Sequence, residues 1–421
     1  MFSPKLSYLL LDIGSSSFKV YAFIDQKLEL VETKSFHFKQ NLDENGELKL
    51  TTKNEFVKYL KDLRARFENY KIKTYCTAFF RSLSQNYKQN LIFEVFDSTG
   101  IFLNIISHDL ENFYLQKALI GKIENLENTI LVNIGGGSSE IIVIQSQEVL
   151  EKYNLEIGIG QLLEKFGKIN EEFCPHDTLE IIEFIKSFLP KLKNIVKIAI
   201  YSGGELEFMR LCDYKIVPNQ VFIDYKHPSQ IRLVDFIDQN KKILSEISIQ
   251  KLMNKMPKDP KWMLGARSCS LIAQAIFENY QIQIIIPSNS NLVDGIIVQE
   301  FQTATLSGSF RKHLDYINKI KVNLENQKVQ ILSPRFAIPK NPGEEFVVFE
   351  GEEGQTALKL EKHHLESIQK SDCLIVCNKE GYVGASALIE IGFAISLDKN
   401  IIFTEIPTEF MLNTLPHQIY E

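Results

Sequence analysis

Short apolar runs alternate with stretches of helical periodicity along most of the chain. The run at residues 129–134 predicts a buried strand, and a helix is predicted over residues 55–69 because apolar side chains recur there at helical spacing (Phe56, Leu60, Leu63 and Phe67). Further strands are predicted at residues 71–77, 140–144, 196–201 and 283–287, and helical patterns at residues 178–193 and through most of 226–280. This alternation indicates an α/β protein in which helices cover largely buried sheets.

One pattern of strand, glycine turn and strand occurs twice along the chain. DIGSSSFKVYAF begins at Asp12, and NIGGGSSEIIVI begins at Asn133. A repeat of this kind predicts two related lobes, about residues 1–125 and 126–302, that face each other across a cleft.

The pattern restarts near residue 301 and predicts a separate C-terminal unit. Strands are predicted at residues 303–306, 329–332, 372–377 and 400–403, and helices at residues 311–326 and 386–396, with another helix ending near Lys370. This βαβαβ unit, residues 303–421, is long enough to be a domain of its own.

Composition narrows the classes of protein that fit this pattern. With 421 residues, 44% of them apolar and 24% charged, the chain has the composition of a globular protein with more than one core. Its formal net charge of −6 argues against a general nucleic-acid binder or membrane-surface binder, so neither partner is expected. The chain lacks the run of about 18 apolar residues that a transmembrane helix needs.

Cysteine usage and the N-terminus bear on location. The six cysteines form no CxxC pair, which favours free thiols over a disulfide frame or a zinc site (Cys76, Cys174, Cys212, Cys269, Cys373 and Cys377). Asp12 interrupts the apolar N-terminus before it reaches the length of a signal peptide. The cytoplasm is therefore the expected location.

The turn of the first hairpin offers groups that bind phosphate. Gly14 lets the backbone turn sharply, so that successive N–H groups can point at an anion. Ser15, Ser16 and Ser17 add short hydrogen-bond donors. Asp12, at the end of the strand, can hold a divalent cation directly or through water.

The turn of the second hairpin is richer in glycine. Three consecutive glycines are costly to order, and a close approach of the backbone to a ligand accounts for them (Gly135, Gly136 and Gly137). Ser138 and Ser139 join them as candidate phosphate-binding residues. Asn133 and Glu140 are candidates for a metal site, and Gly203-Gly204, after the strand KIAIYS, for a further ligand loop.

Two such Gly/Ser hairpins, one in each lobe, are typical of the superfamily of actin, sugar kinases and heat-shock chaperone ATPases, which has a two-lobed, ribonuclease H-like fold. Within it, the chain most resembles the exopolyphosphatase/guanosine pentaphosphate phosphatase family over roughly residues 5–303. The resemblance rests on the segments LLLDIGSSSFKVYAF, TAFFRSLSQN, IISHDLENFYLQKALIG, NIGGGSSEIIVI and LEIGIGQLLEKF, followed by MPKDPKWMLGARSCSLIAQAIFENY and IPSNSNLVDGII.

The resemblance implies a metal-dependent phosphohydrolase that releases terminal phosphate from inorganic polyphosphate or a guanosine polyphosphate such as pppGpp. It places the catalytic glutamate at Glu111 and a phosphate-binding arginine at Arg81. Phosphoanhydride hydrolysis depends mainly on positioning and charge stabilisation. Arg81 suits phosphate through its bidentate fork, Glu111 would orient or deprotonate the attacking water, and Mg²⁺, or Mn²⁺ in its place, near Asp12 and Glu140 would offset the developing charge.

Two departures from the family pattern favour an alternative function. Asn133 begins the second loop where the family has an aspartate. Glu111 lies in HDLEN, where the family has a glycine followed by paired glutamates, so Leu110 and Asn112 are unusual neighbours. The alternative is a protein that senses phosphates or nucleotides without turnover. The sequence does not choose between polymer and nucleotide, and a homodimer is one option for the oligomeric state.

The C-terminal unit carries a second candidate site. In LSGSFRKHLDYI, a strand, a Gly308-Ser309 turn and a helix N-terminus form a seat for phosphate or another anion. KSDCLIVCNKEGYVGASALIEIGFAI resembles nucleoside 2-deoxyribosyltransferases and related nucleotide N-glycosidases over roughly residues 303–406, which implies a flavodoxin- or Rossmann-like domain with a nucleoside or nucleotide ligand. The resemblance places the nucleophilic glutamate at Glu390 and an aspartate of the base pocket at Asp372. His363-His364, on a charged helix, is predicted to be solvated.

Overall fold

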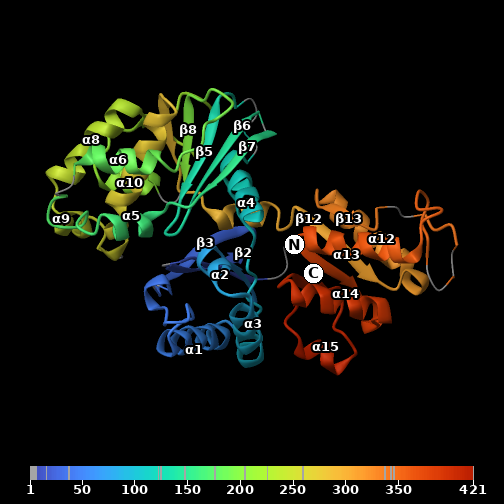
Figure 1. Cartoon of the computed structure of the whole chain (residues 1–421). Coiled ribbons are helices and arrows are strands. Elements are labelled where there is room, and N and C mark those ends of the chain that lie inside the picture. Colours follow the sequence, from blue (N-terminus) through green and yellow to red (C-terminus); the bar gives the residue numbers. More distant parts are fainter. Residues whose placement is uncertain are drawn as a thin grey trace. The chain divides into compact units, whose positions relative to one another are not determined.

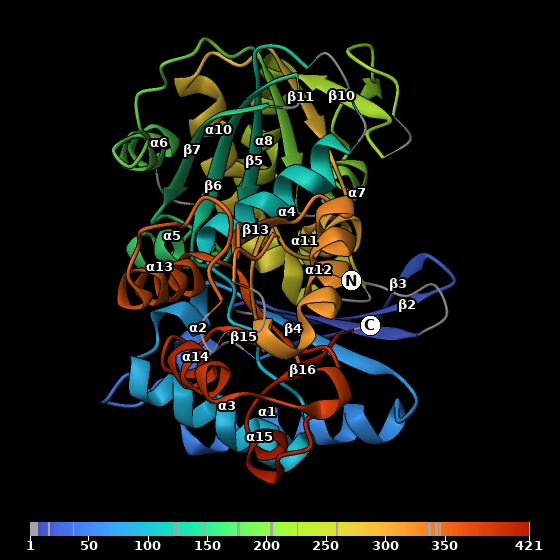
Figure 2. The same ribbon diagram turned by 90° about the vertical axis from the view of Figure 1, so that its right-hand side faces the viewer.

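The computed structural model of the chain (Figures 1 and 2) describes residues 7–420, except residues 16, 37, 122, 124–125, 147, 175–176, 203–204, 225, 258–259, 336–337, 342–343 and 345–346. The chain divides into two compact units. The first unit joins the N-terminal part, up to Leu110, to the C-terminal part from Gln299 onward, and the second unit is Glu111–Val298. The predicted N-terminal lobe and the predicted C-terminal domain therefore belong to one unit.

The N-terminal part of the first unit is built on a four-stranded sheet in the order β3-β2-β1-β4. β1 pairs antiparallel with β2 and parallel with β4. The strands are β1 (Tyr8–Ile13), β2 (Ser17–Ile24), β3 (Lys27–Ser35) and β4 (Lys71–Cys76), and the helices are η1 (Phe38–Asn41), α1 (Leu50–Arg66), α2 (Ala78–Ser82) and α3 (Gln85–Thr99). Side chains of the strands, α1 and α3 form one core, in which Phe18, Phe38 and Phe56 are completely buried.

The second unit repeats this strand order and extends it. Its seven-stranded sheet has the order β7-β6-β5-β8-β11-β10-β9, and β5 pairs antiparallel with β6 and parallel with β8. The strands are β5 (Thr129–Ile134), β6 (Ser139–Gln145), β7 (Glu148–Leu155), β8 (Ile198–Ser202), β9 (Val217–Pro218), β10 (Ser229–Arg232) and β11 (Ile284–Pro287). The repeated hairpin of the sequence is thus a repeated unit of three antiparallel strands and one parallel strand.

Helices cover both faces of the seven-stranded sheet. Ile130 and Val132 of β5 face a core shared with α6, α8 and α10, whereas Leu131, between them, packs against Leu115 and Leu119 of α4 (Figure 1). The helices are α4 (His108–Ile120), which begins in the first unit, α5 (Ile159–Lys165), α6 (Thr178–Lys186), α7 (Glu205–Leu211), α8 (Leu233–Ser245), α9 (Ile249–Asn254), η2 (Pro260–Gly265), α10 (Ala266–Asn279) and α11 (Leu292–Val298). This two-sided burial explains why β5 is an uninterrupted apolar run.

The C-terminal part of the first unit has a five-stranded sheet in the order β13-β12-β14-β15-β16, and all its neighbouring strands are parallel. The strands are β12 (Thr303–Gly308), β13 (Gln330–Ser333), β14 (Cys373–Cys377), β15 (Asn400–Phe403) and β16 (Gln418–Ile419). The helices are α12 (Phe310–Asn326), α13 (Ala357–Lys370), η3 (Lys379–Gly381), α14 (Ala385–Ser396) and α15 (Phe410–Thr414). Because all strands run in one direction, their carboxyl ends meet at one edge of the sheet.

Most predicted elements occur within a few residues of their predicted bounds, and the differences have physical causes. β3 and β7 were not predicted, because both are edge strands with mostly polar, exposed side chains. α6 ends at Lys186 rather than near residue 193, since Pro190 excludes the preceding residue from helical geometry. No helix in the described part of the chain is long and apolar enough to cross a membrane.

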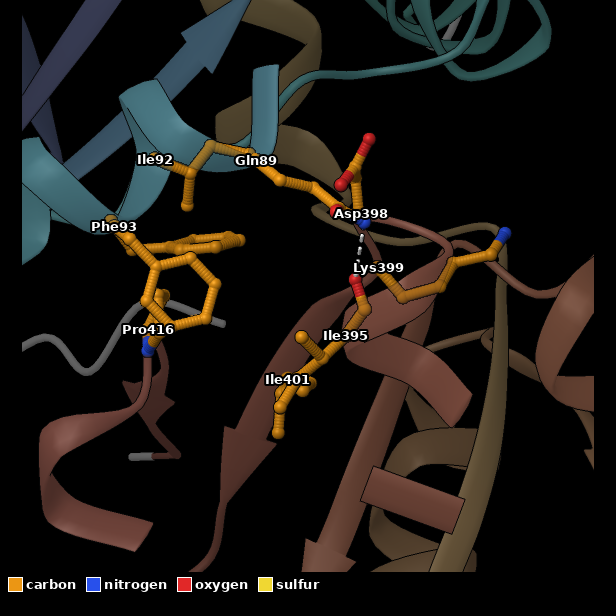
Figure 3. Close-up of a pocket in the computed structure, with 9 residues that line it drawn as sticks. Gln89, Ile92, Phe93, Ile395, Asp398, Lys399, Ile401 and Pro416 are labelled. Atoms are coloured by element: carbon orange, nitrogen blue, oxygen red, sulfur yellow. Dashed lines mark hydrogen bonds between the residues drawn. The ribbon is translucent and has the colours of Figure 1, made fainter. Parts of the chain in front are cut away.

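The two parts of the first unit meet where α3 contacts the C-terminal end of α14. The side-chain amide of Gln85 donates to Asp398 Oδ2 at 2.6 Å, and that of Gln89 donates to the carbonyl of Ser396 at 3.2 Å. Beside these bonds, apolar side chains from both parts line a crevice (Figure 3; Ile92, Phe93, Phe102, Ile395, Ile401 and Pro416). The joint is therefore polar on one side and apolar on the other.

A buried ion pair fixes the chain where it enters the C-terminal part. Lys73 Nζ, on β4, lies 2.8 Å from both carboxylate oxygens of Glu300, and the Tyr75 hydroxyl donates to Glu300 Oε1 at 3.2 Å. The Glu300 side chain is only 2% exposed. A carboxylate this deeply buried depends on its cationic partner.

We predict that Glu300→Gln destabilises the first unit by about 3–5 kcal/mol, because it removes the negative charge that lies 2.8 Å from the largely buried Lys73 ammonium. The midpoint of urea unfolding, followed by fluorescence, measures the effect. The double variant Lys73→Met with Glu300→Leu should recover much of the loss. Glu350→Gln is the matched control, since its partner Lys340 lies in an exposed pair (47% and 53% exposed) and the substitution should change stability little. Equal effects at both sites would contradict the prediction.

Candidate functional site

The first hairpin turn and the start of α2 lie at the same edge of their sheet. β1 and β4 run parallel, with Ile13 opposite Cys76, so the segments that follow both strands leave the sheet together. The Gly14 N–H donates to the Ser17 carbonyl at 2.9 Å and closes the turn. Ser15 is buried, and its carbonyl accepts a bond from the Phe38 N–H at 3.1 Å. Ser16 lies outside the described residues.

Asp12 is half-buried at the end of β1, between Lys19 on β2 and Tyr75 on β4 in the sheet register. Burial raises the pKa of its carboxyl, and the positive charge of Lys19 opposes the shift. A second positive charge close by would favour the ionised form further. Asp12 is therefore a carboxylate that gains from a bound cation.

Arg81 is held at this edge by the backbone. Its Nη1 donates to the carbonyl of Ile106 at 3.0 Å, and its own N–H caps the turn at Thr77. Because α2 begins directly after β4, Arg81 and the Gly14 turn belong to the same end of the sheet. The structure thus brings together Asp12, Ser15 and Arg81 of the predicted site residues.

The second hairpin turn rests on another stretch of backbone. The Gly135 N–H donates to the Ser138 carbonyl at 2.8 Å, which is the same closing bond as in the first turn. The carbonyls of Gly135 and Gly136 accept bonds from the N–H groups of Ile159 and Gly160, at 3.0 and 2.8 Å. The Gln161 side chain donates to the Gly137 carbonyl at 2.8 Å. Segment 158–161 therefore binds the carbonyl side of the loop.

Glycine is required on the supporting segment because the two backbones touch. A Cβ at Gly158 would lie 2.7 Å from both the Gly135 carbonyl oxygen and the Ser138 nitrogen, and a Cβ at Gly160 would lie 2.9 Å from the Gly136 carbonyl oxygen. No role was predicted for these two glycines, although the Gly-x-Gly pattern in LEIGIGQ is visible in the sequence. They determine the shape of the loop rather than its chemistry.

Asn133 and Glu140 face each other across the base of the second hairpin. Asn133 Nδ2 donates to Glu140 Oε2 at 2.8 Å, and the Ser138 hydroxyl donates to Glu140 Oε1 at 2.9 Å. Asn133 Oδ1 accepts from the hydroxyl of Ser202 at 3.0 Å. Glu140 is 1% exposed. Both oxygens of this carboxylate thus have protein donors, and Ser202, which no motif singled out, completes the network.

The serines of the second loop also bind the protein itself. The Ser139 hydroxyl donates to the Ile157 carbonyl at 2.6 Å, and Ser139 is completely buried. Ser138 uses its hydroxyl on Glu140. The phosphate-binding capacity expected of this loop therefore falls to its backbone N–H groups. Gly203 and Gly204 lie outside the described residues.

Glu111 lies in the first turn of α4, and its unusual neighbours have structural partners. Leu110 and Asn112 are buried, and Asn112 Nδ2 donates to Asn154 Oδ1 at 2.8 Å. Asn154 lies on β7 directly opposite Glu140 in the sheet register. Asn112 therefore ties the turn that carries Glu111 to the strand pair that carries Glu140.

A buried carboxyl follows the Gly203-Gly204 segment. Glu205 is 4% exposed, and burial raises its pKa to about 8. Cys269 Sγ lies 3.5 Å from Glu205 Oε1 and 3.0 Å from the Tyr201 hydroxyl. Burial therefore favours the protonated, uncharged form of this carboxyl.

The side chains of the first hairpin fit a magnesium ion better than those of the second hairpin. No group of three or more His, Cys, Asp and Glu side chains gathers among the described residues. In the second hairpin, Asn133 turns its amide nitrogen, not its oxygen, toward Glu140, so this pair is occupied by its own hydrogen bond. Asp12 has no such donor pair among the described residues, and magnesium commonly binds one or two carboxylates together with substrate phosphates.

In the C-terminal part, Gly308 and Ser309 link β12 to α12. Gly308 has a φ of +149°, and a Cβ there would lie 2.9 Å from the Cys377 carbonyl oxygen, so the position requires glycine. Ser309 directly precedes α12, which is kinked at His313. The turn lies at the carboxyl ends of the parallel strands, where such sheets bind ligands.

Asp372 lies at the opposite end of this sheet. Its Oδ2 accepts bonds from the N–H groups of Gln302 and Thr303, at 2.9 and 2.7 Å, and so caps the start of β12. Thr303 begins β12 and Gly308 ends it. The structure therefore does not bring Asp372 to the Gly308 turn, and the base-pocket role predicted for it lacks a geometric basis.

Glu390 is buried on α14 beside a histidine that was predicted to be solvated. His364, on α13, is 8% exposed, and its Nε2 lies 3.3 Å from Glu390 Oε2. The Ser333 hydroxyl, at the end of β13, lies 2.7 Å from His364 Nδ1. The solvation prediction was wrong because α13 packs on β12 and β13, which turns His364 inward despite its charged neighbours.

Two antiparallel hairpins with Gly/Ser turns, each beside a parallel strand, define an α/β fold of the actin-like ATPase type. A profile of the Ppx/GppA phosphatase family matches residues 20–304. The chain belongs to the Ppx/GppA phosphatase family.

Solved structures and a curated relative agree with this assignment. The structure of the Aquifex aeolicus member of the Ppx/GppA family superposes with a TM-score of 0.53 at 21% identity, covering 69% of this chain and 96% of that one. An exopolyphosphatase from Cytophaga hutchinsonii gives 0.56 at 15% identity, with the same coverage. A bifunctional 3-dehydroquinate synthase/phosphatase of Fusobacterium nucleatum is 24% identical over 313 residues, 68% of this chain and 46% of that protein. This chain thus spans about half the length of that relative.

We predict that Gly158→Ala destabilises the second unit by about 1–3 kcal/mol, since the added Cβ forces the Gly135 turn away from its support. Scanning calorimetry measures the change. Gly167→Ala is the control, because a Cβ there meets nothing closer than 3.7 Å. A Gly158→Ala protein as stable as the control would show that the two backbones separate readily.

We predict that Asn133→Asp makes the stability of the second hairpin depend on a cation. The substitution replaces a donor 2.8 Å from Glu140 Oε2 by a second carboxylate, so the pKa of the pair rises. Stability is then greatest at acidic pH and is lost as the pH rises through that raised pKa. Thermal melts from pH 5 to 8, with and without magnesium, should show recovery by the ion in the variant and little response in the natural protein. The same magnesium response in both proteins would contradict this account.

Proposed function

We propose that this protein is a metal-dependent phosphohydrolase that releases terminal phosphate from inorganic polyphosphate or from a guanosine polyphosphate such as pppGpp. The observation that carries the proposal is the pair of Gly/Ser turns, each closed by the same N–H to carbonyl bond, at Gly14 and at Gly135. Membership of the Ppx/GppA family supports the reaction class. The Cytophaga hutchinsonii protein of similar fold is an exopolyphosphatase, which favours a polyphosphate as the substrate.

The residues would divide the work of phosphoanhydride hydrolysis. The backbone N–H groups of both turns would bind phosphate oxygens, and Arg81, oriented by the Ile106 carbonyl, would bind them through its guanidinium group. Glu111 would orient or deprotonate the attacking water. Asp12 would hold a magnesium ion together with the substrate, and such an ion supplies positive charge that offsets the charge developing on the phosphate.

A colorimetric phosphate-release assay tests this proposal. Polyphosphate chains and pppGpp are compared at equal concentrations of phosphoanhydride, with magnesium or manganese. Release from one class alone assigns the substrate. If the protein binds these substrates but releases phosphate from none of them, it is a sensor and not a hydrolase.

The sensor is the alternative function, and the Asn133–Glu140 bond is the observation that favours it. The amide occupies an oxygen of Glu140 that the family aspartate would leave to a cation or water. A protein in which asparagine takes the place of this second carboxylate can still bind anions. Tight binding of pppGpp or polyphosphate without turnover, at any magnesium concentration, would support this function.

We propose, as a second function, that the C-terminal domain binds a nucleoside or nucleotide and cleaves its N-glycosidic bond. Numbered within the domain, its strand order is 2-1-3-4-5, which is that of flavodoxin-like, doubly wound proteins. Glu390 Oε2 and the hydroxyls of Thr305 and Ser307 are buried and have no hydrogen-bond partner among the described residues. Buried polar atoms of this kind call for a ligand or water.

A thermal-shift screen of nucleosides and nucleoside monophosphates on the full chain tests the second function, followed by chromatography for free base. Glu390→Ala should abolish base release. A monophosphate contains no phosphoanhydride, so its binding reports on this site and not on the phosphatase reaction. Failure of every compound to shift the melting temperature would remove the nucleotide role.

For the phosphatase reaction, we predict that Glu111→Gln lowers kcat by about 100- to 10,000-fold, because it keeps the side-chain shape and removes the base. KM should change little, since the residue acts on water. Asp109→Asn is the matched control, because Asp109 is an exposed carboxylate in the same helical turn. Near-natural turnover by Glu111→Gln would remove Glu111 from the mechanism.

A further inference from the structure

We infer that His364 sets the charge of the C-terminal site, so that an anionic ligand binds there only while His364 is protonated and neutralises Glu390. The inference rests on the proposed nucleotide-binding role of this domain. His364 is a positioning residue in this account, because it acts through Glu390 and the site charge rather than on the reacting atoms.

The geometry holds the imidazole between one neutral and one acidic partner. Ser333 Oγ lies 2.7 Å from Nδ1, and Glu390 Oε2 lies 3.3 Å from Nε2. The Nε2 and Oε2 atoms face each other without the alignment of a full hydrogen bond, and neither bonds another described atom. With side-chain exposures of 11% and 5%, water screens the two groups little.

Among the described residues, the charged groups that act most strongly on His364 are acidic. They are Glu390 from α14, Glu361 from its own helix α13, and Glu352 from the segment before that helix, while β13 contributes the uncharged Ser333. Burial lowers the pKa of His364, but these carboxylates outweigh it and raise the pKa above the ordinary value. Burial and Glu390 likewise raise the pKa of Glu361, and His364 opposes that shift.

The charge state decides which ligands the site accepts. The Gly308 turn lies at the carboxyl ends of the strands, and Lys312, whose ammonium lies 4.0 Å from the centre of the Tyr382 ring, adds positive charge beside it. Ser307, on β12, is completely buried, and its hydroxyl has no hydrogen-bond partner among the described residues. A phosphate bound here adds negative charge to the carboxylate cluster, and protonated His364 offsets it. Because its folded-state pKa is raised, this offset is present at lower pH and is lost as pH rises through that pKa.

A ligand-free titration tests the pair by itself. In the full-length protein, the His364 C2–H resonance is assigned by its absence from the His364→Gln spectrum, and its pKa is followed by NMR. We expect a value above that of an unperturbed histidine, and a lower one in Glu390→Gln. An unshifted value in the natural protein, or one that Glu390→Gln leaves unchanged, would overturn the inference whatever the domain binds.

Calorimetric binding tests the consequence, with 2′-deoxyguanosine 5′-monophosphate as the charged probe and 2′-deoxyguanosine as the uncharged one. Above the His364 pKa, affinity for the monophosphate should fall by up to about tenfold per pH unit, and affinity for the nucleoside should not. His364→Gln should remove that fall while keeping any dependence that comes from the probe's own phosphate. Monophosphate affinity with the same pH profile in both proteins would overturn the inference, whereas a raised His364 pKa with no binding of either probe would overturn the nucleotide role instead.

Discussion

The conformation of the loop at residues 135–138 depends on contact between two stretches of backbone. Its carbonyls are bound by the N–H groups of Ile159 and Gly160, and the spacing leaves no room for a Cβ at Gly158. The supporting segment leads directly into α5, whose Leu162 is buried in the core with residues of α10. The loop therefore cannot shift without moving part of that core, and its orientation is set by packing far from any ligand.

The sequence predicts elements well where burial and periodicity coincide. β5, α12 and β15 are buried or strongly amphipathic, and each appears within a residue or two of its predicted bounds. The pattern fails at the sheet edges, because the side chains of β3 and β7 are mostly solvated and their pairing depends on a neighbour rather than on their own composition. It fails for His364 for the opposite reason: a charged helix still buries the side chains that face the sheet beneath it.

The candidate site, like the fold, could be predicted only in part. Gly14, Gly135 and the strand ends were visible in the sequence, because turns demand particular residues at particular places. The partners of the polar side chains were not visible, since Asn133 meets Ser202 and Asn112 meets Asn154 across long stretches of chain. Asp372 is an example. Its sequence motif suggested a ligand pocket, but its carboxylate accepts hydrogen bonds from two backbone N–H groups at the other end of the sheet.

The joint between α3 and α14 has a consequence for how the chain is made. Gln89 and the carbonyl of Ile395 that it approaches are 306 residues apart, with the whole second unit between them. At a synthesis rate of about 5–20 residues per second, the N-terminal part waits roughly 15–60 s on the ribosome before its partner surface emerges. Throughout that interval the side of α3 that carries Gln85 and Gln89 lacks its partner, so the joint can form only after the second unit has been made.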